Sequence, residues 1–217
     1  MLLKEIIVLL TWVLDTLIVK IIIMKKIVQF LIAVFLFSSC SNSNKPSDIN
    51  TSKTVEIPKE SIYNVADTFY TQNNEKVTLN YFLNKPTVVG MIFTNCSYAC
   101  PRLTSDMTGI ENNLKEDDGK INYVMVSFDT ERDTPEQLKK FADEMKLGKN
   151  WTLLTGSENA VRSISVLLNV QFEKDAEGDF SHSNKVSVLD KKGVLKFQKE
   201  GLEEDHKETI SVIKKLL

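Results

Sequence analysis

Two cysteines spaced four apart are the residues of this sequence with the clearest chemical potential. Cys96 and Cys100 lie in the segment 93–101, which reads FTNCSYACP. A thiolate attacks disulfides and binds metals, and two soft sulfur ligands favour Cu(I) over hard cations. A third ligand would complete a trigonal metal site. The spacing alone leaves three options open: a metal site, redox chemistry, or a structural disulfide that closes only a small loop.

Two histidines could supply a third ligand. His206 lies in the charged run 203–207 at the start of the last predicted helix, where we expect its ring to face solvent. His182 follows a glycine-containing loop, AEGDFS at 176–181, and precedes a predicted strand that begins at Lys185. In a thioredoxin-like fold this loop faces the two cysteines. His182 is therefore the candidate third ligand.

A buried strand and a helix are predicted to position the cysteine pair. Residues 87–93 form an apolar run rich in β-branched side chains, the pattern of a central strand buried on both faces. Apolar residues then recur every three or four positions as far as Lys115, which predicts a helix. Because Pro101 suits the first helical position, Cys100 is predicted at the N-cap. Unpaired amides and the positive helix end would favour a thiolate there.

Strands and helices alternate along the rest of the chain. Strands are predicted at 77–79, 121–128 and 151–154, and helices follow Thr134-Pro135 and Ser157. The second of these helices carries the apolar residues Val161, Ile164, Val166, Leu167 and Leu168. Segments 186–189 and 194–197 predict a β-hairpin, and a last helix follows Gly201. The fold class is therefore α/β, a thioredoxin-like fold with a central mixed sheet flanked by helices and a hairpin near the C-terminus.

The N-terminal residues predict export. Met24 begins a basic start that is followed by an apolar stretch at 27–37 and by two serines before Cys40, the pattern of a secretory signal. The apolar stretch is too short to span a bilayer. We predict a signal peptide region at 1–39, with translation starting at Met24. The alternative is a transmembrane anchor, and either places the domain outside the cytoplasm, in the cell envelope.

A lipid anchor and a tether are predicted to join the signal to the folded domain. The segment 37–40, FSSC, resembles the lipobox of bacterial lipoproteins, which implies that Cys40 is acylated and attaches the protein to a membrane. Residues 40–60 begin with a polar run and are predicted to be a flexible tether, and 61–217 the folded domain. The net charge of −2 gives no reason to expect nucleic acid as a partner.

Four blocks together resemble the Sco/SenC family of copper chaperones for cytochrome c oxidase assembly. They lie between about Val77 and Leu202 and read VVGMIFTNC with CP, VSFDTERDTP, WTLLTG, and HS before VSVLDKKG. The resemblance implies that Cys96, Cys100 and His182 bind copper. It also matches Asp129 to an acidic position near the site; the other reading of Asp129 is a surface acid that leads a helix.

The resemblance also implies a task and a partner. The protein would deliver copper, as Cu(I) or Cu(II), to the dinuclear copper centre of cytochrome c oxidase, or keep the cysteines of that centre reduced. The partner would be the oxidase subunit that holds this centre. One residue departs from the family, because Ser97 stands where Pro is usual. Without the fixed φ of proline the loop is freer.

Three other functions remain as alternatives. An extracytoplasmic thiol–disulfide oxidoreductase could use the same dithiol, but the spacing is not Cys-x-x-Cys, and Ser183-Asn184 stand where such enzymes usually carry a cis-proline. A thiol peroxidase would need a threonine three residues before its cysteine, and Thr94 lies only two before Cys96. A metal-free assembly or sensing module would leave the two cysteines and the histidine unexplained.

Overall fold

The computed structural model describes residues 20, 24–26, 56–202 and 205–217. The chain divides into two units, Met1–Lys53 and Thr54–Leu217. The predicted signal sequence, apart from those four residues, and Cys40 lie outside the described residues. In the part of the chain that is described, no helix has both the length and the apolar character needed to cross a bilayer.

The second unit contains a hydrophobic core of its own. Its buried apolar side chains run from Ile62 to Ile213, all within this unit. Because a compact unit with a separate core has what a domain needs to fold, Thr54–Leu217 can be studied as an independent domain.

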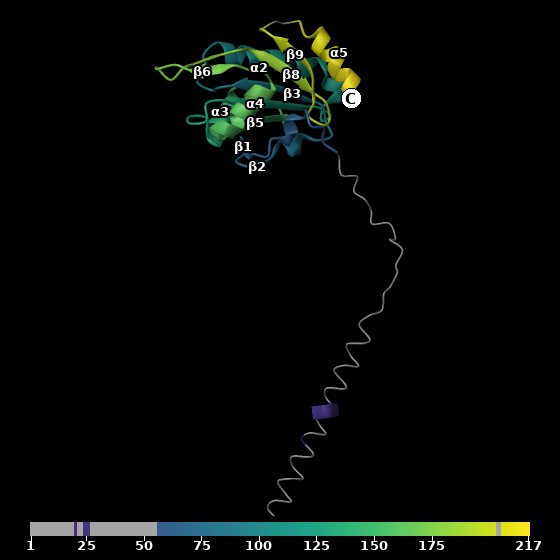
Figure 1. Ribbon diagram of the computed structural model, residues 1–217. Helices are drawn as coiled ribbons and strands as arrows, with labels where there is room; N and C mark the ends of the chain where they lie inside the picture. The colour runs from purple at the N-terminus through teal and green to yellow at the C-terminus, as the bar shows by residue number, and fades with distance from the viewer. Residues whose placement is uncertain (1–19, 21–23, 27–55, 203–204) are drawn as a thin grey trace, which may run out of the picture. The chain divides into compact units, whose positions relative to one another are not determined.

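A seven-stranded mixed sheet forms the centre of the domain (Figure 1), in the order β2-β1-β5-β4-β3-β8-β9. The central strands β3, β4 and β5 are parallel, whereas β8 and β9 run antiparallel at one side. The mixed sheet and the C-terminal hairpin were both predicted and are confirmed. The strand bounds are β1 Phe69–Thr71, β2 Lys76–Val77, β3 Thr87–Ile92, β4 Asn122–Ser127, β5 Trp151–Gly156, β8 Lys185–Leu189 and β9 Leu195–Glu200.

Four helices pack against this sheet: α2 (Ala99–Asn113), α3 (Pro135–Glu144), α4 (Glu158–Leu167) and α5 (Lys207–Leu216). Helices α2 and α5 contact each other and strand β8, whereas α3 and α4 contact β5. The described residues also contain three short 3-10 turns, η1 (Ile62–Asn64), η2 (Leu79–Phe82) and η3 (Lys115–Asp117). The alternation of strands and helices confirms the thioredoxin-like α/β fold.

The two predicted helix caps are confirmed. The Thr134 side chain accepts a hydrogen bond from the Gln137 amide, and the Ser157 side chain accepts one from the Ala160 amide. These bonds satisfy amides that have no partner inside the helix. Strand β3 is buried at all six positions, as its apolar run predicts.

Not every apolar residue of helix α4 is buried. Val166 and Leu167 are 77% and 44% exposed, because the helical turn carries them off the face on which Ala160, Val161 and Ile164 pack. The predicted strand 77–79 is shorter, since Leu79 already belongs to η2.

Two further features escaped sequence analysis. Strand β1 extends the sheet beyond β5, where the Phe69 ring lies over Gly156. Strands β6 (Phe172–Lys174) and β7 (Phe180–His182) form a second, two-stranded sheet, and β7 includes the last two residues of the predicted loop 176–181. All three are only three residues long, too short for a recognisable alternation of apolar and polar residues.

Candidate metal site

The two cysteines lie at the carboxyl end of β3. Cys96 is half-buried in the loop after the strand, and Cys100 is fully buried in the first turn of α2. The prediction that Cys100 is the N-cap is wrong, because Tyr98 holds that position and Ala99 is already helical. Pro101 is still accommodated, since amides of the first turn have no partner within the helix.

His182 lies at the end of β7 and meets the cysteines. The ligand atoms of Cys96, Cys100 and His182 all lie within 4.8 Å of one another. The Sγ atom of Cys100 and Nε2 of His182 are 3.8 Å apart, although the two residues are separated by 82 positions in the chain. Both cysteines are free thiols. The structure therefore brings together the three residues that the sequence singled out.

Burial decides the protonation of Cys100. It raises the pKa of this thiol well above its usual range, and the nearby Cys96 and Asp133 add to the effect. The Phe93 amide donates a hydrogen bond to Cys100 Sγ at 3.4 Å, which opposes the rise without cancelling it. The thiolate predicted from the helix end is thus wrong for Cys100 in the metal-free protein, because desolvation outweighs the local amides. A bound cation would supply the missing positive charge.

The imidazole of His182 is oriented for coordination. Burial lowers its pKa, which favours the neutral ring. Its Nδ1 lies 3.4 Å from the carbonyl oxygen of Ser183, and because a carbonyl only accepts hydrogen bonds, this contact assigns the proton to Nδ1. The Nε2 lone pair then faces the thiols, the arrangement that metal-binding histidines use. The rings of Phe128 and Phe93 pack beside the imidazole at 5.0 and 6.1 Å.

Asp133 supports the cysteine loop, and sequence analysis did not single it out. This carboxylate is 1% exposed. It accepts hydrogen bonds from the amide and the hydroxyl of Thr94, at 2.9 and 2.6 Å, and from the Ser127 hydroxyl at 2.5 Å. Burial raises its pKa, and these hydrogen bonds oppose the rise. Its place in the loop between β4, the strand beside β3, and helix α3 was the available signal.

Asp129 is not a surface residue, because it is 1% exposed. Its carboxylate forms an ion pair with the Arg132 side chain and accepts a hydrogen bond from the Arg132 amide at 3.3 Å. It does not belong to the cluster of Cys96, Cys100 and His182. The reading as a helix-leading surface acid is therefore wrong, and the carboxylate contacts Arg132 instead of the thiols.

His206 lies apart from the site. It occupies the N-cap position of α5 and is half-buried. A Cβ atom on Gly109 of α2 would lie 2.6 Å from its Nε2, so the ring packs on that helix. The expectation that it faces solvent is wrong, because the missing side chain of Gly109 leaves room for the ring.

Comparisons with known proteins place the chain among Sco proteins. A family model described as SCO1/SenC matches residues 59–217. The SCO1 protein homolog of Bacillus subtilis (strain 168) is 33% identical over 114 residues, which cover 52% of this chain and 59% of that relative. The chain thus spans about three fifths of the length of that relative.

Two solved structures show the same fold. A SCO1/SenC family lipoprotein from Bacillus anthracis str. Ames superposes with a TM-score of 0.64 at 26% identity, over 69% of this chain and 91% of that one. BsSco, described as a member of the Sco family of cytochrome c oxidase assembly proteins with a disulfide switch, superposes with a TM-score of 0.61 at 29% identity, over 69% and 90%.

Proposed function

Because the chain belongs to the SCO1/SenC family, we propose that it is a metallochaperone that binds copper through Cys96, Cys100 and His182. The observation that carries the proposal is the convergence of two sulfurs and one imidazole nitrogen within 4.8 Å. Soft thiolates select Cu(I), and imidazole also suits Cu(II). This donor set can therefore hold copper in either state.

Differences in exposure suggest how copper enters and leaves. Cys100 is fully buried, whereas Cys96 and His182 are half-buried. Copper and its acceptor would approach from the side of these two residues. Loading displaces the proton of the Cys100 thiol, since metal ligands must be deprotonated. The released copper would pass to thiols of the acceptor.

We propose that the acceptor is the subunit of cytochrome c oxidase that holds the dinuclear copper centre. The role of BsSco in oxidase assembly supports this assignment. We propose further that residues 1–39 direct export, that acylated Cys40 attaches the protein to a membrane of the cell envelope, and that 40–60 tether the domain 61–217. The B. anthracis relative, described as a lipoprotein, supports the anchor.

A second candidate function uses the same two thiols. The protein could reduce the cysteines of the copper centre, and its cysteines are free and close enough to oxidise to a disulfide. The disulfide switch described for BsSco favours this candidate. One observation opposes it. The described residues contain no cis peptide bond, so the Ser183–Asn184 peptide lacks the cis geometry that is usual at this place in thioredoxin-like reductases.

Copper retention by the reduced Thr54–Leu217 domain tests the proposed ligands. We expect one copper per chain to remain bound against a competing chelator. Cys96→Ser and Cys100→Ser should abolish retention, and His182→Ala should weaken it strongly. His206→Ala is the matched control, because that ring packs on Gly109 away from the thiols. Equal retention by all variants would refute the site.

Transfer to the acceptor separates the two candidate functions. The copper-loaded domain is mixed with a reduced soluble copper-centre domain, the two proteins are separated, and the copper and free thiols of each are measured. Delivery predicts that copper is found on the acceptor while the donor cysteines remain reduced. In a parallel sample, the metal-free domain is mixed with an oxidised acceptor. The reductase function is favoured if the copper-loaded domain passes on no copper and the metal-free domain reduces the acceptor while its own cysteines form a disulfide.

A further inference from the structure

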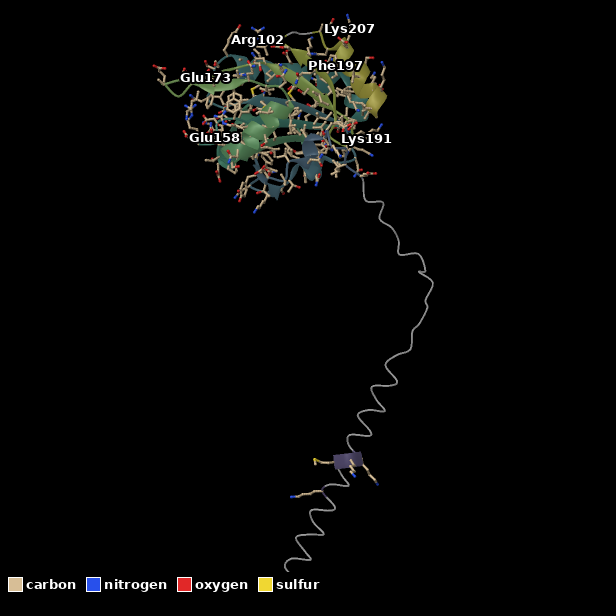
Figure 2. All side chains as sticks on the ribbon, in the orientation of Figure 1. Arg102, Glu158, Glu173, Lys191, Phe197 and Lys207 are labelled. Carbon is tan, nitrogen blue, oxygen red and sulfur yellow. The ribbon has the colours of Figure 1, made fainter. Side chains whose placement is uncertain are left out.

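His182 is carried by a hairpin that does not join the main sheet. Strands β6 and β7 pair only with each other, over three residue pairs that include Phe172 with His182. The hairpin projects from the domain (Figure 1), and Glu173 on β6 lies at the outer edge in Figure 2. An isolated two-stranded hairpin is only marginally stable in water. The position of the imidazole therefore depends on contacts from outside the hairpin.

Apolar contacts supply part of that support. Phe172 and Phe180 of the hairpin pack on Phe128, with ring centroids 5.1 and 5.0 Å apart. Phe180 also packs on Phe93 at 5.2 Å. These contacts hold the hairpin against the body of the domain, but the hydrophobic effect is non-directional. They do not by themselves set how far the hairpin reaches over the cysteines.

Arg132 supplies a directional contact. Its Nη2 donates a hydrogen bond to the carbonyl oxygen of Gly178, at 2.5 Å, in the turn of the hairpin. Its guanidinium lies 5.9 Å from the centre of the Phe180 ring. Its Nε bonds the carboxylate of Asp129. A planar guanidinium can make both hydrogen bonds at once because its N–H groups point in fixed directions.

Asp129 fixes the other end of this connection. Its side chain is 1% exposed, whereas that of Arg132 is 39% exposed. A buried carboxylate requires a partner, so Arg132 is held on the body of the domain while its outer edge reaches the hairpin. The hairpin turn is itself ordered by a left-handed Gly178, at φ +86, which presents the carbonyl that Arg132 binds.

We propose that Arg132 is a positioning residue of the copper site: anchored on Asp129, it fastens the hairpin turn so that Nε2 of His182 stays beside Sγ of Cys100. This inference rests on the proposed function for its effect on copper, but the positioning of the ring is a property of the metal-free protein. Gly178 and His182 lie on the same short hairpin, so releasing the turn frees the ligand.

Arg162 offers a matched control. Its guanidinium also packs on the hairpin, 5.3 Å from the centre of the Phe172 ring. Its Nε, however, donates to Glu158 on its own helix, an exposed partner, instead of to the hairpin backbone. Arg162→Ala removes an arginine of α4 that packs on the hairpin, but it breaks no hydrogen bond to the hairpin turn.

The first experiment follows the His182 ring protons by NMR in the metal-free Thr54–Leu217 domain. The rings of Phe93 and Phe128 shift these resonances in the folded protein. We expect Arg132→Ala to move them toward free-histidine values and to speed amide exchange at Asp179 and Ser183 at least tenfold, with Arg162→Ala close to wild type. Unchanged resonances and exchange in Arg132→Ala would overturn the proposal.

Arg132→Lys keeps the test decisive if Arg132→Ala does not fold. The lysine ammonium retains a positive charge for Asp129 but cannot supply the two fixed N–H directions of arginine. We expect the same change of the His182 resonances in this variant. A wild-type spectrum for Arg132→Lys would overturn the proposal, because charge alone would then suffice.

The second experiment is a double-mutant cycle on copper retention. Arg132→Ala should weaken retention at least fivefold in the wild-type background and less than twofold when His182→Ala is already present. A similar loss in both backgrounds would overturn the proposal, because Arg132 would then act without His182. If the wild-type domain retains no copper, the proposed function fails, and the NMR experiment still decides the positioning role.

Discussion

Both carboxylate oxygens of Asp133 accept hydrogen bonds from Thr94. The Thr94 hydroxyl donates to Oδ1 at 2.6 Å and its amide donates to Oδ2 at 2.9 Å. Thr94 lies two residues before Cys96, and Asp133 lies just before helix α3. Asp133 also accepts a hydrogen bond from the Ser127 hydroxyl at the end of β4. This one buried carboxylate therefore joins the cysteine loop to the strand beside β3.

This relationship predicts the effect of removing one hydroxyl. Thr94→Val leaves Oδ1 of the buried carboxylate without its hydrogen-bond donor, which should lower the free energy of unfolding by about 2 kcal/mol. Urea unfolding of the Thr54–Leu217 domain measures the loss. Thr108→Val is the control, because its hydroxyl bonds only the Thr104 carbonyl of its own helix. A similar loss in both variants would contradict a special role for the Thr94 hydroxyl.

The two cysteines should differ in reactivity. Cys100 is fully buried and burial raises the pKa of its thiol, whereas Cys96 is half-buried. Because alkylation requires an accessible thiolate, iodoacetamide should modify Cys96 first in the metal-free folded domain. Peptide mass spectrometry over a time course measures the order. In concentrated urea the two should react at similar rates, and preferential labelling of Cys100 in the folded state would count against the described burial.

Tyr63 should make the domain sensitive to alkaline pH. Burial, together with the charge of Asp190, raises the pKa of Tyr63 from 10.0 to about 12. A raised folded-state pKa means that the protonated phenol stabilises the fold fully below pH 10 and that this contribution is lost as the pH rises toward 12. About 1.4 kcal/mol should be lost by pH 11.

A variant isolates this contribution. Tyr63→Phe loses the hydrogen bond to Thr87, 2.8 Å long, and should be less stable than wild type by about 1 kcal/mol at pH 8. Because phenylalanine does not titrate, this difference should vanish by pH 11. Urea unfolding at several pH values measures it, and a difference that stays constant with pH would show that Tyr63 does not carry the effect.

Gly109 and His206 should be coupled. Alanine stabilises a helix interior by about 1 kcal/mol relative to glycine, but a Cβ on Gly109 would lie 2.6 Å from Nε2 of His206. Gly109→Ala should therefore gain about 1 kcal/mol when His206→Ala is present and less in the wild-type background. Thermal or urea unfolding of the four variants completes the cycle; equal gains in both backgrounds would mean that the ring does not occupy this space.

Local patterns in the sequence were sufficient to predict the central strand, two helix caps and the importance of the cysteine pair. The apolar run of β3 predicts a doubly buried strand because each of its side chains must leave water. The caps at Thr134 and Ser157 are short-range interactions between a side chain and the amide three residues later. The cysteine pair could be recognised as chemically important because both cysteines lie within five consecutive residues, 96–100.

Tertiary structure decided how these parts act. The helix end next to Cys100 favours a thiolate, yet its pKa is raised because the folded domain removes the sulfur from water. Several contacts join residues far apart in the chain. They are the hydrogen bonds between Thr94 and Asp133, the pairing within the hairpin that carries His182, and the hydrogen bond from Arg132 to Gly178. Sequence periodicity reports which side chains avoid water; it does not report which distant groups meet, because that depends on how the whole chain closes around its core.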